Sequence, residues 1–165
     1  MYSTTKNKMD KDIENRIIEG IKKHFGDKLV SIVLFGSQAR GTATEHSDID
    51  LVVIAKGVPS NWRKQKEIIL VVRWSEELSS LPVSIILKNP TTVKSSLSVI
   101  QPLLFGILKS YKVLYDSTNF FETQAEIYRK NMKKWRVEEI GEDAWRVGVI
   151  ADEARKKANS GSILH

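Results

Sequence analysis

The sequence contains no cysteine and only three histidines in 165 residues. Without cysteine, disulfides, thiolate zinc sites and cysteine nucleophiles are all excluded. The histidines, His24, His46 and His165, are too few and too scattered along the chain to predict a metal cluster. Carboxylate oxygens therefore remain as the ligands that this chain offers to a metal ion.

Long apolar runs are missing as well. No stretch approaches the roughly 18 to 20 consecutive apolar residues that a membrane-spanning helix needs. The start of the chain, MYSTTKNKMDKDIENR, also lacks the apolar stretch of a signal peptide. We therefore expect a cytoplasmic protein without a membrane partner, and the absence of cysteine agrees with a reducing compartment.

The charge balance is basic, with 26 Lys+Arg against 20 Asp+Glu and a formal net charge of +6. Such an excess attracts anionic partners, for example nucleotides or nucleic acid. The positive charges are spread along the chain without a dense basic tail, so a solvated surface also accounts for many of them. Hydrophobic residues make up 41% of the chain, which is enough for one sizeable core.

Hydrophobic periodicity predicts helices that alternate with strands over the first two thirds of the chain. Apolar residues at helical spacing predict helices over 9–25 and 60–78, and a helical segment over 91–109 that Pro102 kinks or restarts. Short apolar runs predict strands at 29–35, 48–54, 83–87 and 111–116. This order predicts an α/β fold, with a mixed, twisted sheet of about four strands flanked by helices.

Beyond Asp116 the pattern becomes helical. One stripe contains Phe120, Gln124, Ile127, Tyr128 and Trp135, and another contains Ala144, Val147, Ala151, Ala154 and Ala158. We expect Gly141 to separate two helices here. The chain then divides into a core domain over 1–116 and a helical extension over 117–165, which packs either on the domain or on a second subunit of a homodimer.

The segment LFGSQARGTATEHSDIDLVV, residues 34–53, contains two features that point to phosphate and metal chemistry. Gly36 follows a buried strand and lets a phosphate approach the backbone, while the amide and hydroxyl of Ser37 can donate hydrogen bonds to it. Asp48 and Asp50 lie on the same face of the next strand, because side chains alternate along a strand. Two such carboxylates repel each other unless a cation bridges them, and their oxygens suit Mg²⁺ or Mn²⁺ held together with substrate phosphates.

This segment resembles the signature of the DNA polymerase beta nucleotidyltransferase superfamily. It is most similar to the minimal nucleotidyltransferases of bacteria and archaea, which show Gly-Ser-x-Ala-Arg-Gly followed by Ser-Asp-x-Asp-Leu. Every position of these motifs is matched, by Gly36, Ser37, Ala39, Arg40, Gly41, Ser47, Asp48, Asp50 and Leu51. The resemblance is strongest over residues 29–54, runs more loosely to Asp116 and does not include residues 117–165.

The resemblance implies a nucleotidyltransferase fold and a metal-dependent transfer of a nucleoside monophosphate from a triphosphate to a hydroxyl acceptor. It implies that Gly36 and Ser37 contact the β and γ phosphates. Asp48 and Asp50 would then be the catalytic residues that hold the metal, and Arg40 would contact phosphate or pin its own loop through a salt bridge. Related antitoxin-type members modify a protein hydroxyl and pair with a helical HEPN partner, so the resemblance also implies a HEPN-like protein partner.

One position departs from the family pattern. Family members that catalyse transfer present a third carboxylate from a later strand, which binds the catalytic metal and takes the proton from the attacking hydroxyl. The resemblance expects this carboxylate at residue 84, which is a serine here. Glu76 or Glu77 would replace it only in a different strand register. Ser84 therefore raises an alternative function, a nucleotide-binding regulatory module with weak or no transfer activity.

A second group of residues has two interpretations. Trp62, Arg63, Lys64 and Lys66 combine an aromatic ring with three positive charges within five residues. Stacking together with phosphate contacts is a way of binding nucleic acid. An ordinary solvated helix face would show the same pattern.

Overall fold

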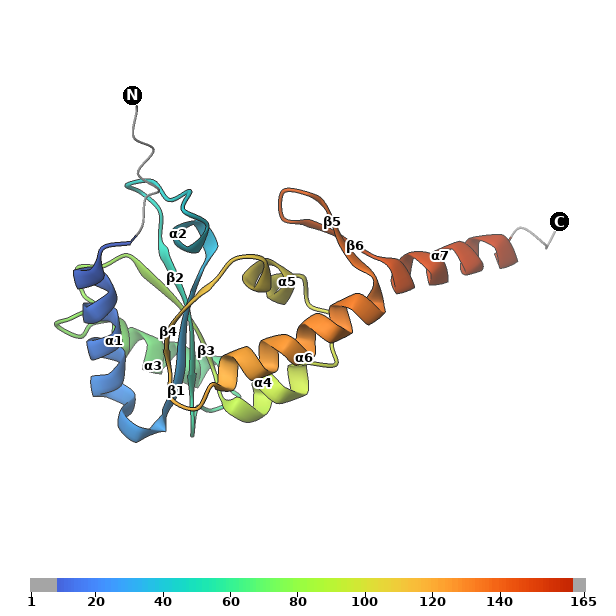
Figure 1. The fold of residues 1–165 in the computed structure, drawn as a ribbon. Helices are drawn as coiled ribbons and strands as arrows, with labels where there is room; N and C mark the ends of the chain where they lie inside the picture. Colours follow the sequence, from blue (N-terminus) through green and yellow to red (C-terminus); the bar gives the residue numbers. More distant parts are fainter. Residues whose placement is uncertain (1–8, 162–165) are drawn as a thin grey trace, which may run out of the picture.

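The computed structural model describes residues 9–161, and its centre is a four-stranded sheet (Figure 1). The strands are β1 (Leu29–Phe35), β2 (Ile49–Ala55), β3 (Val83–Lys88) and β4 (Lys112–Asp116), in the order β3-β2-β1-β4. β1 is antiparallel to β2 and β4, whereas β2 is parallel to β3. The mixed sheet predicted from the sequence is confirmed. Residues 1–8 and 162–165, and with them His165, lie outside the described part of the chain.

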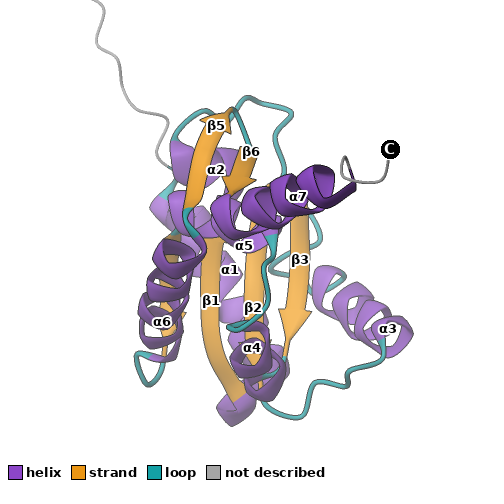
Figure 2. Ribbon diagram, turned by 90° about the vertical axis from the view of Figure 1, so that its right-hand side faces the viewer, coloured by secondary structure: helices purple, strands orange, loops and turns teal. Residues whose placement is uncertain are grey.

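Helices cover both faces of this sheet (Figures 1 and 2). The helices α1 (Lys11–Phe25) and α3 (Trp62–Arg73) lie on one face, and α4 (Pro90–Ser96), α5 (Pro102–Lys109) and α6 (Phe120–Trp135) lie on the other. Alternate residues of β2 supply the two cores. Leu51 and Val53 pack toward α1, while Val52 and Ile54 pack toward α5 and α6. By the same alternation, Asp50 belongs to the face that α5 and α6 cover.

The predicted helix over 91–109 is two helices in the structure. Asn89 caps α4, because its side-chain oxygen accepts a hydrogen bond from the amide of Thr92 at 2.7 Å. Pro102 restarts the helix as the first residue of α5, a position where its missing N–H costs nothing. The helix predicted to run to residue 78 ends earlier, at Arg73, and the chain makes turns before β3.

The prediction of a helix over residues 144–158 is wrong for the first turn of that helix. Residues Val137–Gly141 and Ala144–Val147 form the antiparallel hairpin β5–β6, and α7 (Gly148–Gly161) begins only after it. Gly141 does lie between two helices, α6 and α7, but as the last residue of β5 in this hairpin. The side chains explain the difference, since Trp145 packs edge-on against Phe105 of α5, with ring centroids 5.6 Å apart. This contact joins residues 40 positions apart, which helical spacing does not reveal.

The helix α6 is tied to the sheet and to the loop before α5. The carboxylate of Asp116 accepts hydrogen bonds from the amides of Phe120 and Phe121, at 2.9 and 2.8 Å, at the start of the helix. The fully buried Tyr128 donates its hydroxyl hydrogen to the carbonyl oxygen of Val99 and accepts from the amide of Gln101. The hairpin and α7 extend away from the sheet (Figure 1). Packing of the 117–165 extension on a second subunit stays a prediction.

Within residues 9–161, no helix combines the length and the apolar character that crossing a membrane requires.

Candidate active site

The glycine turn after β1 lies directly against Asp50. Gly36 has a positive φ of 72°, and it follows Phe35, whose register partner on β2 is Asp50. A Cβ placed on residue 36 would lie 2.4 Å from Oδ2 of Asp50, well inside the contact distance of two heavy atoms. Both the backbone angle and the space therefore require glycine. The sheet register brings the two halves of the sequence motif, which are separated by the loop before β2, into contact.

Asp48, Asp50 and Arg40 form one electrostatic group. Asp50 is half-buried on β2, whereas Asp48 is exposed in the residues just before that strand. Burial and then the negative charge of Asp48 raise the pKa of the Asp50 carboxyl, while the Arg40 guanidinium opposes this rise. Neither aspartate forms a hydrogen bond or an ion pair of its side chain with another residue in 9–161. The charge of Arg40 offsets part of their repulsion, and a bound cation would relieve it further.

The short helix α2 (Gly36–Arg40) carries Ser37 and leads into the loop before β2. The carbonyl oxygen of Ser37 accepts a hydrogen bond from the amide of Thr42 at 3.0 Å, which closes the helix. Further along, the amide of Thr44 donates to Oγ of Ser47 at 2.9 Å, immediately before Asp48. These bonds hold the loop between the glycine turn and the aspartates. His46 is exposed on this loop.

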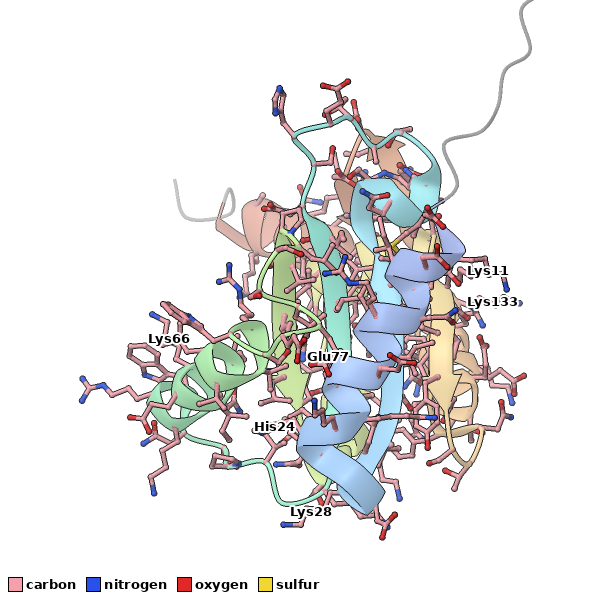
Figure 3. The ribbon with its side chains drawn as sticks, turned by 90° about the vertical axis from the view of Figure 1, so that its left-hand side faces the viewer. Lys11, His24, Lys28, Lys66, Glu77 and Lys133 are labelled. Atoms are coloured by element: carbon pink, nitrogen blue, oxygen red, sulfur yellow. The ribbon has the colours of Figure 1, made fainter. Side chains whose placement is uncertain are left out.

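The register of β2 and β3 pairs Asp50 with Ser84, so the exposed Ser84 occupies the position beside Asp50. No group of three or more His, Cys, Asp or Glu side chains suited to a metal ion occurs among the described residues. Glu77 does not fill the gap, because its carboxylate binds Nζ of Lys23 on α1 at 2.9 Å. Figure 3 shows Glu77 between α1 and α3, on the face of the sheet opposite to that of Asp50.

The donor set fits part of a divalent metal site. Mg²⁺ is usually held by one or two carboxylates, while substrate phosphates and water complete its six oxygen ligands. Asp48 and Asp50 supply two such carboxylates, and the half-buried Asp50 lacks a bonded cationic partner in the described part of the chain. These two residues therefore fit a metal that arrives together with a triphosphate, rather than a site formed by protein ligands alone.

Comparison with known proteins identifies the family. Residues 14–114 match the model of the nucleotidyltransferase domain, which is more than half of the chain, and the protein belongs to this family. A protein of Methanocaldococcus jannaschii that is provisionally named a protein adenylyltransferase is 37% identical over 143 residues. The alignment covers 85% of this chain and 95% of that relative. A second protein from the same organism, with the same provisional activity name, is 39% identical over 84 residues, 48% of this chain and 83% of the relative.

Solved structures of low sequence identity also resemble the chain. One is described as a tri-AMPylated HEPN toxin of Shewanella oneidensis in complex with an MNT antitoxin. The matched chain is 20% identical with a TM-score of 0.48, and 78% of this chain and 93% of that chain are covered. Another is a spectinomycin adenyltransferase of Enterococcus faecialis with ATP and spectinomycin. It is 13% identical with a TM-score of 0.46, and the match covers 74% of this chain and 65% of that chain.

Proposed function

We propose that this nucleotidyltransferase transfers AMP from ATP to a hydroxyl group of a protein in the cytoplasm, with Mg²⁺ or Mn²⁺ as cofactor. The observation that carries the proposal is the contact of the Gly36 turn with Asp50, which sets a phosphate-binding turn against a carboxylate pair. Membership of the nucleotidyltransferase family supports the reaction type. The 37% identical relative named as a protein adenylyltransferase supports ATP as the donor and a protein as the acceptor.

In this proposal, Gly36 and Ser37 bind the β and γ phosphates and Arg40 contributes a charge-assisted contact to phosphate. Asp48 and Asp50 hold the metal, which supplies Lewis-acid stabilisation of the charge on the phosphates. The acceptor oxygen forms a bond to the α-phosphorus while the bond between the α and β phosphates breaks, and pyrophosphate leaves. Since Ser84 is not a base, the proton of the acceptor hydroxyl passes to solvent, and transfer is slow compared with an enzyme that has a third carboxylate.

The acceptor that we propose is a HEPN-like helical protein, with this chain acting in the manner of an antitoxin. The resemblance of the Gly36–Leu51 motif to that of antitoxin-type minimal nucleotidyltransferases supports this choice. A neighbouring gene for a HEPN-like protein would supply the acceptor to be tested.

A second function is favoured by one specific observation. Ser84 occupies the position beside Asp50 where a third carboxylate would complete the metal and base site. Binding of the donor needs only the glycine turn and the two aspartates, whereas efficient transfer also needs the base. A nucleotide-binding regulatory module that has lost most of its transfer activity is therefore the alternative.

Thermal unfolding with ATP and Mg²⁺ tests the nucleotide site. A ligand at a hundredfold excess over its Kd stabilises the native state by about 2.7 kcal/mol, which raises the Tm of a chain of this size by about 5 to 10 °C. We expect Asp48→Asn/Asp50→Asn to remove this rise. The matched control is Glu126→Gln/Glu153→Gln, which removes two exposed charges from α6 and α7. A rise of equal size in the aspartate variant would refute the metal-site assignment.

Transfer is then measured with ATP labelled at the α-phosphate and with the candidate acceptor. Label on the acceptor, together with released pyrophosphate, supports the enzyme. Nucleotide binding without label from any of the four ribonucleoside triphosphates would support the regulatory module instead.

A further inference from the structure

A basic cleft lies at the end of the sheet opposite to the nucleotide site. β2 begins beside that site at Ile49 and ends at Ala55, six residues and about 20 Å further on. There the loops after α1 and after β2 meet, because the amide of Lys56 donates to the carbonyl oxygen of Lys28 at 2.8 Å. The cleft between these loops and α3 has a volume of about 420 Å³, and its lining includes Lys23, His24, Lys28, Lys56 and Ile68.

The charge of this cleft is positive and partly unpaired. Lys23 forms an ion pair with Glu77, but Lys28 and Lys56 are exposed and pair with no carboxylate among residues 9–161. Among the residues that the structure describes, no Asp or Glu lines the cleft. In Figure 3, His24 and Lys28 at the lower end of α1 lie on the same side of the molecule as Lys66 of α3. The cleft thus presents cations to solvent next to α3.

The outer face of α3 adds aromatic rings to these charges. Trp62, Lys66, Leu70 and Trp74 are all exposed, and their spacing of four turns them by about 40° per step, so that they wind round the outer side of the helix and its cap. The exposed fractions of Trp62 and Trp74 are 60% and 81%, large values for tryptophan. Nζ of Lys66 lies 5.0 Å from the ring centroid of Trp62. An exposed ring that already carries a cation is suited to stack with a base while the cation meets a phosphate.

We propose that the α3 face and the basic cleft together form a binding surface for single-stranded nucleic acid, separate from the nucleotidyltransferase site. Phosphates would contact Lys28, Lys56 and Lys66, and bases would stack on Trp62 and Trp74. α3 alone extends for about 18 Å, long enough for several nucleotides. The surface contacts the phosphate charges and the faces of the bases, which all nucleotides share. It is therefore expected to bind single strands with little sequence preference.

Charge argues against a second copy of the chain as the occupant of this surface. A two-fold symmetric contact places the same patch of both copies together. The patch on α3 contains Arg63, Lys64, Lys66 and Arg73, and Glu67 is the single acidic residue of the helix. None of the four cations forms an ion pair within the described residues. Two copies would therefore bring like charges together, whereas a polyanion neutralises them.

The test is fluorescence anisotropy of a labelled 12-nucleotide oligo(U), titrated with the 165-residue chain in the absence of triphosphate. We expect Trp62→Ala/Trp74→Ala to weaken binding by at least about tenfold, because stacking on each ring is lost. Lys28→Glu/Lys56→Glu/Lys66→Glu should weaken binding and lower the slope of log K against log salt by about 2, at roughly 0.7 per phosphate contact. Trp62→Tyr/Trp74→Tyr keeps aromatic rings and should retain most of the affinity.

Lys130→Glu/Lys133→Glu/Lys134→Glu is the matched control, since it changes the net charge equally through exposed residues of α6. Equal weakening by this control and by the cleft variant would overturn the proposal, and so would full affinity of the Trp62→Ala/Trp74→Ala variant. Stronger binding of poly-glutamate or of phosphatidylserine vesicles than of oligo(U) would overturn it as well. Retained oligo(U) binding in Asp48→Asn/Asp50→Asn is expected, which separates this surface from the nucleotide site.

Discussion

Gly36 and Asp50 are packed so closely that a single methyl group on residue 36 would lie 2.4 Å from Oδ2 of Asp50. The two residues are far enough apart in the sequence that only the pairing of β1 with β2 brings them together. The contact joins the turn proposed for phosphate with the carboxylate proposed for metal. Changes at either residue are therefore expected to affect the other.

Gly36→Ala should destabilise the protein and abolish nucleotide binding. The substitution combines a left-handed backbone angle, which costs about 1 to 2 kcal/mol for a residue with a Cβ, with the overlap on Asp50. Gly41→Ala is the matched control, because Gly41 has nearly the same φ, 73°, and no heavy atom of another described residue lies within 4 Å of its Cβ position. Thermal unfolding with and without ATP and Mg²⁺ measures both effects. A larger loss in Gly41→Ala than in Gly36→Ala would contradict the packing argument.

Asp50→Asn should stabilise the protein when metal and nucleotide are absent. The pKa of Asp50 is raised in the folded state, chiefly by burial, so folding favours its protonated form. The corresponding stability is fully present below the unfolded-state pKa, about 3.9, and is lost as the pH rises through the folded-state pKa. Asparagine avoids this loss.

Calorimetry in EDTA should therefore show a higher Tm for Asp50→Asn than for the unaltered protein at pH 7, with the difference vanishing near pH 3. Glu126→Gln, at an exposed position of α6, serves as the control and should change little. An Asp50→Asn protein that melts below the unaltered protein at pH 7 would mean that the ionised carboxylate has a stabilising partner.

Ser84→Asp should raise the rate of transfer. Residue 84 pairs with Asp50 across β2 and β3, so the new carboxylate would stand beside the aspartate pair. A positioned general base contributes about 10² to 10⁴ in rate, and we expect a gain of about 10²-fold in labelled AMP transfer to an acceptor. Ser84→Asn has a similar size without the charge and should give no gain. Equal rates for these two variants would show that the missing base does not limit transfer.

Tyr128→Phe should loosen the attachment of α6. The hydroxyl of this buried residue bonds to the carbonyl oxygen of Val99 at 2.9 Å and to the amide of Gln101 at 3.1 Å. Its removal leaves these two partly exposed backbone groups to water and should cost about 1 kcal/mol in free energy of unfolding. Tyr115→Phe is the control, because the Tyr115 hydroxyl makes no hydrogen bond with another described residue. Urea unfolding measures the free energy of unfolding of both variants. Equal losses in Tyr128→Phe and Tyr115→Phe would argue against a stabilising role of the two Tyr128 hydrogen bonds.

Local sequence patterns were sufficient for the parts of the molecule that depend on neighbouring residues. The apolar run before Gly36 predicts β1, and the run around Asp50 predicts β2, although the strand begins at Ile49 and leaves Asp48 in the loop before it. Pro102 predicts the restart of a helix because its ring excludes the helix interior. These features are set by backbone sterics and by hydrophobic periodicity, which act over a few residues.

The tertiary structure decided what depends on residues far apart in the chain. The stripe of Ala144 and Val147 has helical spacing, yet the packing of Trp145 on Phe105 accompanies a hairpin there. The closeness of Gly36 to Asp50 and of Asp50 to Ser84 follows from strand register, which local periodicity does not determine. The sequence by itself therefore determined the motif and its elements. Long-range pairing and packing decided which side chains meet, because contacts between distant segments leave no local period in the sequence.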